Sequence, residues 1–150
     1  MSHRIVTEVE IDAPLQDVWA ELVDLPGFSE WNPFMTRAAG DVEVGSRLEI
    51  RMEPPGGSAM TFKPHVTDVA HAARLEWLGS LGVGGLFDGR HQFDLVPTAD
   101  GTRLIQSEDF TGLLVPLLKK SLDTKTRAGF VAMNHALKRR AEARSHADGA

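Results

Sequence analysis

The sequence predicts an α+β fold in which an antiparallel sheet packs against helices. A segment that alternates apolar and polar residues opens the chain, and an amphipathic helical pattern follows it. Several further alternating segments then follow one another, separated by short turns, and a long helical pattern closes the chain. Consecutive strands with short connections form an antiparallel meander, and helices confined to the two ends cannot build repeated βαβ units. The expected class is therefore α+β.

About seven strands are predicted from period-two alternation. In the first of them, Ile5, Val9 and Ile11 share one face with Thr7. The predicted strands are residues 3–11, 35–39, 46–53, 59–69, 73–79, 87–95 and 102–110. Pro64 lacks the amide hydrogen that a central strand needs, which indicates a sheet edge or a bulge at that point.

One or two short helices are expected between the first two strands, the first of them within residues 12–24. Asp12 can cap it and Pro14 suits its first turn. Its apolar positions recur at i, i+3, i+4 and i+7 and are Leu15, Val18, Trp19 and Leu22. Residues 25–33 contain Pro and Gly and are expected to form a loop or a short second helix.

A long helix is predicted after Pro116. Its apolar stripe consists of Leu118, Leu122, Phe130, Met133 and Leu137. The basic run 138–140 suits the negative end of the helix dipole, and residues 145–150 are expected to be a disordered tail.

The bulk composition describes a single globular domain and excludes several function classes. The 150 residues carry a net charge of −5, so a global basic field for nucleic acid is absent. No cysteine is present, which excludes disulfides, thiolate metal sites and a cysteine nucleophile. The six histidines have no metal-ligand spacing, so neither a metal nor a cofactor is expected. No apolar run is long enough to span a membrane and no signal peptide is visible, so we expect no membrane insertion and a cytoplasmic location.

Four phrases of the sequence, in their order along the chain, resemble the START-like or SRPBCC superfamily, which includes the polyketide cyclase/dehydrase group and the major birch pollen allergen. The phrases are "VEIDAPLQDVWAELVDLPGFSEWNPF", "RLEWLG", "FDGRHQFDLVPTADGTRLIQSEDFTGLL" and "GFVAMNHALKRRAE". The resemblance covers about residues 3–142 and implies one START-like domain over 1–150. It implies a helix-grip fold, in which the curved sheet wraps around the C-terminal helix and leaves a cavity for an apolar or amphipathic molecule between them.

If the sheet is curved around the helix, the inner face of each strand lines this cavity. The candidate ligand-binding residues are His91, Glu108, Gln106, Trp77, Phe62, Ile50, Phe93, Phe130, Met133 and Asn134. Most of them are apolar, as the walls of ligand pockets usually are. The few polar members are therefore the residues that could orient a ligand or take part in catalysis.

His91 lies in the apolar row of the strand 87–95, and the pairing register decides whether a carboxylate meets it. If Leu95 lies opposite Leu104, then His91 lies opposite Glu108 inside the fold. A shift of one residue would instead bring Glu108 opposite Arg90 on the outer surface. The larger apolar residues of the second strand favour the inner pair. There the carboxylate would favour the imidazolium form of His91, whereas burial would oppose it.

Three functions stay open on the sequence. The first is binding of a small hydrophobic or amphipathic molecule between the sheet and the C-terminal helix. The second is a cyclase- or dehydrase-like enzyme that acts on a polyketide or aromatic substrate in the same cavity, with His91 and Glu108 as weak catalytic candidates. The third is a co-chaperone-type interaction module with a filled core. A homodimer is left open as well.

Overall fold

The computed structural model describes residues 2–148, which form eight strands and a set of helices. The strands are β1 (Ser2–Ile11), β2 (Met35–Ala39), β3 (Glu49–Met52), β4 (Met60–Phe62), β5 (His65–Ala70), β6 (Arg74–Ser80), β7 (Asp88–Pro97) and β8 (Thr102–Thr111). The helices are α1 (Leu15–Val23), the 3-10 turn η1 (Leu25–Gly27), α2 (Phe28–Trp31), α3 (Val115–Ser121), the π-helical turn η2 (Leu122–Thr126) and α4 (Arg127–Asp148).

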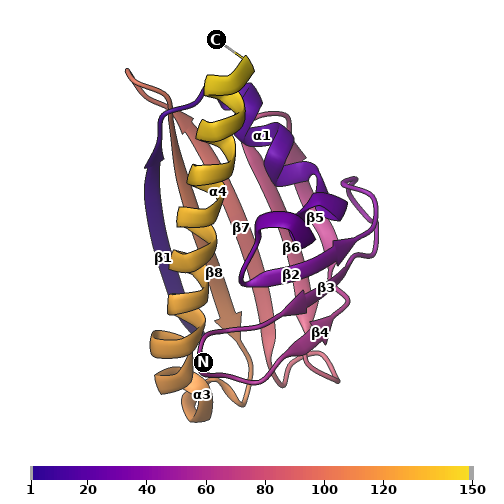
Figure 1. The fold of residues 1–150 in the computed structure, drawn as a ribbon. Helices are drawn as coiled ribbons and strands as arrows, with labels where there is room; N and C mark the ends of the chain where they lie inside the picture. Colours follow the sequence, from indigo (N-terminus) through magenta and orange to yellow (C-terminus); the bar gives the residue numbers. More distant parts are fainter. Residues whose placement is uncertain (1, 149–150) are drawn as a thin grey trace.

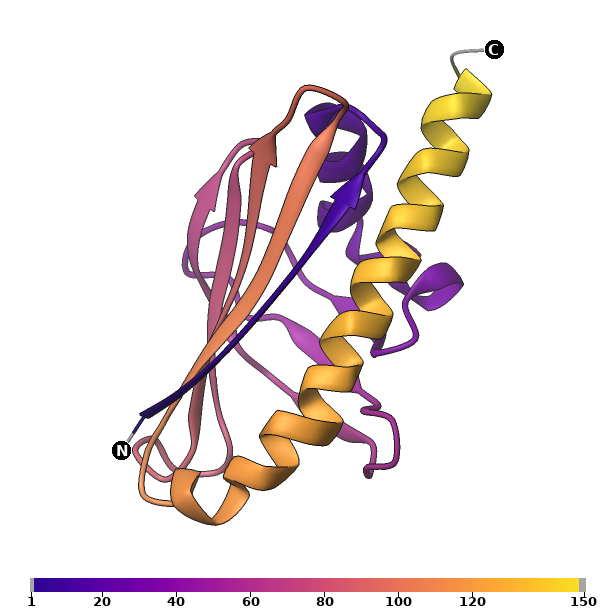
Figure 2. The ribbon, with the colours of Figure 1, turned by 90° about the vertical axis from the view of Figure 1, so that its left-hand side faces the viewer.

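The strands form two antiparallel sheets that face the C-terminal helix. The larger sheet has the order β1-β8-β7-β6-β5, and the smaller one has the order β2-β3-β4. Helix α4 runs along the concave side of the larger sheet, and the smaller sheet lies beside it over β5 and β6 (Figure 1). In the view at right angles, α3 lies at the lower end of the sheet, and α4 rises from there along one side of the sheet and diverges from it towards the C-terminus (Figure 2). The α+β class and the helix-grip arrangement are confirmed.

The predicted strand 59–69 is wrong as a single element, because the chain changes sheets at Pro64. β4 ends at Phe62 and pairs with β3, whereas β5 begins at His65 and pairs with β6. The carbonyl of Pro64 accepts a hydrogen bond from the amide of Leu48 (2.7 Å), which shows that this part of the chain still pairs, with a different neighbour.

The core lies between the concave sheet face and the helices. Phe93 and Leu104 from the sheet are fully buried, as are Leu22 of α1 and Phe130 of α4. Burial of such a side chain contributes about 1.5–3 kcal/mol, so the inward rows of the strands and the apolar stripe of α4 hold the two layers together.

The helix boundaries differ from the expected ones in three places. The first helix of the C-terminal segment, α3, begins at Val115 and includes Pro116 in its first turn, so it does not start after Pro116. Helix α1 begins at Leu15 after Pro14, and Asp12 does not cap it. Helix α4 continues to Asp148, so the predicted disordered tail is wrong for residues 145–148. There His146 Nε2 lies 3.2 Å from the carbonyl oxygen of Asp12, which ties the last turns to the end of β1. Residues 149 and 150 of the predicted tail lie outside the described residues.

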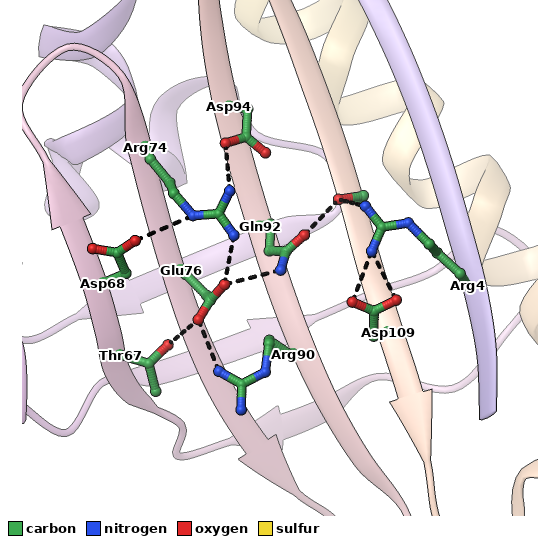
Figure 3. A network of polar contacts seen from close by, with 10 residues as sticks. Arg4, Thr67, Asp68, Arg74, Glu76, Arg90, Gln92, Asp94 and Asp109 are labelled. Carbon is green, nitrogen blue, oxygen red and sulfur yellow. Dashed lines mark hydrogen bonds and ion pairs between the residues drawn. The ribbon is translucent and has the colours of Figure 1, made fainter. Parts of the chain in front are cut away.

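The convex face of the larger sheet carries a polar network centred on Glu76 (Figure 3). Glu76 accepts hydrogen bonds from Arg74 (2.7 Å), Arg90 (2.8 Å), Gln92 (2.9 Å) and Thr67 (2.8 Å). Burial by itself would raise the pKa of Glu76, but the hydrogen bonds, led by that from Arg74, outweigh it and lower the pKa to about 2. The network thus joins β5, β6 and β7 on the face opposite α4.

The polar network of Glu76 continues across the convex face of the sheet towards β1 as a row of hydrogen-bonded side chains. Ser107 donates to the side-chain oxygen of Gln92 (3.1 Å), and Arg4 reaches Ser107 (3.3 Å) and both oxygens of Asp109 (2.7 Å each). Side chains of all five strands of the larger sheet are therefore connected in one line, which favours a single register for the whole sheet.

We expect this network to make the fold sensitive to acid. Because the folded pKa of Glu76 lies below its ordinary value of 4.5, its contribution is present above pH 4.5 and is lost as the pH falls towards 2. The loss should be of the order of 3 kcal/mol. Urea unfolding at a series of pH values should show this dependence in the wild type and a weaker one in Glu76→Gln. The matched control is Glu43→Gln at an exposed glutamate, which should unfold like the wild type at every pH. Equal pH dependence in Glu76→Gln and the wild type would contradict the assignment.

Candidate functional site

The register between β7 and β8 places His91 opposite Glu108. Leu95 lies opposite Leu104, and Phe93 lies opposite Gln106. The inner pairing is therefore the one that forms. The alternative, in which Arg90 faces Glu108, is wrong because Arg90 is on the convex face and donates to Glu76.

His91 is completely buried within a set of rings. Its imidazole stacks on Trp77, with ring centroids 5.3 Å apart and an interplanar angle of 23°. Phe93 and Phe130 lie at centroid distances of 4.7 and 4.9 Å. This packing fixes the ring plane, so the two nitrogens of His91 point in defined directions along the sheet.

A chain of hydrogen bonds, buried except at half-buried Thr7, runs from His91 to the C-terminal helix and to β1. His91 Nδ1 lies 3.0 Å from Glu108 Oε1, and His91 Nε2 lies 2.9 Å from Gln106 Oε1. Gln106 Nε2 donates to Asn134 Oδ1 (2.7 Å) on α4, and Asn134 Nδ2 donates to Thr7 Oγ1 (2.9 Å) on β1. Five side chains from three strands and one helix are thus joined through the middle of the fold.

A cavity of about 310 Å³ opens beside Glu108 at the end of the molecule where α3 lies. The turn between β3 and β4, the ends of β6, β7 and β8 and the segment of α3 and η2 form its walls, and most of the lining side chains are apolar. Its lining residues are Phe34, Met52, Pro54, Gly57, Ser58, Met60, Phe62, Pro64, Trp77, Gly79, Ser80, Leu81, Phe87, Gly89, Glu108, Phe110, Leu118, Ser121, Leu122, Lys125 and Thr126.

Only part of the predicted ligand-binding set reaches this cavity. Trp77, Phe62 and Glu108 line it. The others lie in the packed interior behind these residues and are not among its lining residues: His91, Gln106, Ile50, Phe93, Phe130, Met133 and Asn134. Of this second group, His91, Gln106 and Asn134 remain connected to the cavity through Glu108.

Phe34 explains why the cavity occupies only one end of the space between sheet and helix. Its ring packs against Phe130, with centroids 5.7 Å apart, and it also lines the cavity. The ring lies directly on Gly129 of α4, where a Cβ atom would collide with it. Phe34 therefore forms the wall between the cavity and the filled half of the interior.

Sequence reasoning missed the polar residues at the cavity wall. Ser58 comes from the turn between β3 and β4 and Ser80 is the last residue of β6, whereas Ser121, Lys125 and Thr126 come from the end of α3 and from η2. No sequence signal marks them, because the π-helical turn changes which side chains of the helix face inward. Single π turns inside α-helices are frequent at functional sites.

Gly89 makes room for the carboxylate of Glu108. It lines the cavity on β7, two residues before His91, and a Cβ atom at Gly89 would overlap Glu108 Oε2. Glu108 itself is 9% exposed, and among residues 2–148 its Oε2 has no hydrogen-bond partner. One oxygen of Glu108 thus holds His91, while the other is free beside the cavity.

Neither a metal site nor a membrane span is found in the described part of the chain. Among residues 2–148, no three His, Cys, Asp or Glu side chains are grouped so that they could hold a metal ion. None of the helices in this range is long and apolar enough to cross a membrane.

We expect Gly89→Ala to break the Glu108–His91 pair. The added methyl group would push the carboxylate away from His91 and leave a buried polar atom unpaired, which costs about 1–3 kcal/mol of unfolding free energy. Urea unfolding should show that this loss is much smaller in a Glu108→Ala background, since no carboxylate is then displaced. Gly84→Ala is the control because a Cβ atom there meets nothing within 4 Å. An equal cost of Gly89→Ala in both backgrounds would contradict this account.

Comparison with known proteins gives similar folds and one family. No curated protein matches the sequence. Among solved structures, the chain is similar to the ZhuI aromatase/cyclase from Streptomyces sp. R1128, with a TM-score of 0.78, 17% identity and 96% of each chain covered. It is also similar to protein MLL2253 from Mesorhizobium loti, with a TM-score of 0.72, 20% identity and 95% and 98% of the two chains covered.

A further similar structure is the di-domain aromatase/cyclase StfQ from the steffimycin biosynthetic pathway, with a TM-score of 0.79 and 16% identity. The comparison covers 97% of this chain and 53% of StfQ, so the chain spans about half the length of that two-domain protein. At these identities the likeness concerns the fold. The family model described as "Polyketide cyclase / dehydrase and lipid transport" matches residues 2–142, and the chain therefore belongs to this family.

Proposed function

We propose that this protein binds a small hydrophobic or amphipathic molecule in the cavity beside Glu108. The observation that carries the proposal is the cavity itself, which has about 310 Å³ of space, largely apolar walls and one carboxylate oxygen that has no partner among residues 2–148. Ligand sites commonly combine apolar walls with a few polar groups that orient the ligand. The family description, which includes lipid transport, supports the same class of ligand.

The distribution of polar groups favours an amphipathic ligand. Glu108 lies at the inner wall, while Ser121, Lys125 and Thr126 lie on the segment that closes the opposite side. Lys125 is exposed, so its ammonium group stays in contact with water. A molecule with an apolar middle and a polar group at either end would place one polar group beside Glu108 and the other beside the segment of Ser121, Lys125 and Thr126.

We expect Ser121→Trp to block the cavity. The indole would occupy the space that an aromatic probe needs, so binding of 1-naphthol should weaken at least tenfold, which corresponds to about 1.4 kcal/mol. Isothermal titration calorimetry measures this affinity, and thermal unfolding checks the fold. Ser29→Trp introduces the same side chain on exposed α2, away from the cavity, and should bind like the wild type. Equal affinity in Ser121→Trp and the wild type would place the probe elsewhere and contradict the proposal.

A second candidate function is cyclase- or dehydrase-like catalysis in the same cavity. The observation that favours it is the contact between Glu108 and His91 at the cavity wall, because such a pair can exchange a proton with a bound substrate. A cyclase also works by holding a flexible chain in one conformation, for which few polar groups are needed. Incubation with a synthetic poly-β-keto thioester should then yield a cyclised product with the wild type and much less with His91→Ala. Binding of the thioester without any product would contradict this second candidate.

The expectation of a co-chaperone-type module with a filled core receives less support, because the interior beside Glu108 is open. The cytoplasmic location stays a prediction from the sequence. The homodimer stays open, as it was on the sequence.

A further inference from the structure

The buried hydrogen-bond chain behind the cavity has a direction, and this direction determines what Glu108 offers to a ligand. Thr7 lies at the end of this chain that is farthest from Glu108 and the cavity. Thr7 Oγ1 lies 3.0 Å from the backbone carbonyl oxygen of Gln106. A carbonyl oxygen only accepts hydrogen bonds, so the single hydroxyl hydrogen of Thr7 points at it. Thr7 Oγ1 can then only accept in its contact with Asn134.

Each following group is oriented by the one before it. Asn134 presents its NH₂ group to Thr7, so its Oδ1 faces Gln106. Gln106 must therefore present its own NH₂ group to Asn134, and the same NH₂ group lies 3.4 Å from the backbone carbonyl oxygen of Phe130, which also only accepts. The backbone carbonyls of Gln106 and Phe130 thus each require the same orientation of the two side-chain amides. The Oε1 atom of Gln106 faces His91, so His91 Nε2 carries a hydrogen.

This result leaves one proton between His91 and Glu108. With Nε2 protonated, Nδ1 either carries a second hydrogen or has a bare lone pair. A bare Nδ1 at 3.0 Å from a bare carboxylate oxygen would place two lone pairs against each other in a buried site. One proton therefore lies between Nδ1 and Oε1, bonded to either atom. In both arrangements the pair is neutral overall, and Glu108 Oε2 carries no hydrogen.

On this basis, and resting on the proposed function, we infer that the cavity selects ligands that bear a neutral hydroxyl group, phenolic or alcoholic, directed at Glu108 Oε2. Because Oε2 is an acceptor in both proton arrangements, the ligand must supply the donor. An ether or ketone oxygen at the same place would face Oε2 with lone pairs on both sides. A cationic donor would lose its hydration without meeting a net negative charge, since the Glu108–His91 pair is neutral. Gly89 keeps the approach to Oε2 open, because it has no side chain there.

The test compares two ligands that differ only in the donor, 1-naphthol and 1-methoxynaphthalene, by isothermal titration calorimetry. The wild type should bind 1-naphthol at least tenfold more tightly. In Glu108→Gln the new amide should donate its NH₂ group to the bare Nδ1 of neutral His91 and leave its oxygen at the cavity, so the preference should persist. In Glu108→Met the carboxylate oxygen is replaced by a thioether sulfur, which accepts only weakly, so the preference for 1-naphthol should be largely lost.

The outcomes separate this inference from the proposed function. If both ligands bind the wild type equally well, or if Glu108→Gln prefers the ether, the inference is overturned while ligand binding stands. If neither ligand binds the wild type, the proposed function fails and the inference fails with it.

A second measurement needs neither a ligand nor the Glu108→Met variant. Long-range ¹H–¹⁵N spectra of the wild type and of Glu108→Gln report which nitrogen of His91 carries a hydrogen. Both proteins should show a protonated Nε2, and Glu108→Gln should show the neutral Nε2–H tautomer. A bare Nε2 in either protein would overturn the direction of the chain and the ligand class inferred from it.

Discussion

The pairing of β7 with β8 is the constraint on which both faces of this sheet depend. With Leu95 opposite Leu104, His91 meets Glu108 on the concave side. The same pairing places Gln92 opposite Ser107 on the convex side, where their hydrogen bond continues the row that begins at Glu76. Because side chains alternate between faces, a slip by one residue would carry the apolar row outward and the polar row inward. The core on one side and the polar network on the other therefore favour the same register.

The inner polar chain and the outer polar network differ in how much contact with water their polar groups keep. The outer network lies beneath arginine side chains that keep contact with water, and it holds its central carboxylate in the charged form. The inner chain is buried among aromatic rings, where an unpaired polar atom is costly, so every donor must meet an acceptor. This requirement restricts the chain to one direction. Among residues 2–148, the oxygen Oε2 of Glu108 has no partner and lies beside the cavity.

The cavity results from uneven filling of the space between the sheet and the helices. Aromatic rings occupy one half, and Phe34, seated on Gly129, forms the boundary. In the other half the walls come from turns and from the π-helical segment 122–126, whose side chains do not fill the space between them. A helix-grip fold can therefore have a well-packed core and an open cavity in the same interior, one towards each end of the C-terminal helical segment.

The sequence alone determined the fold class, most of the strands and the apolar face of the strand 87–95, because alternation and helical spacing are local properties of the chain. It also marked His91 as a polar residue in an apolar row. Only the tertiary structure decided between the two registers, divided the strand around Pro64 between two sheets and continued the last helix beyond residue 144. It also showed that most of the predicted ligand-binding residues lie behind the cavity. The physical reason is that a cavity depends on how residues far apart in the chain fill a shared volume, as Phe34 and Gly129 do, and no local pattern records that volume.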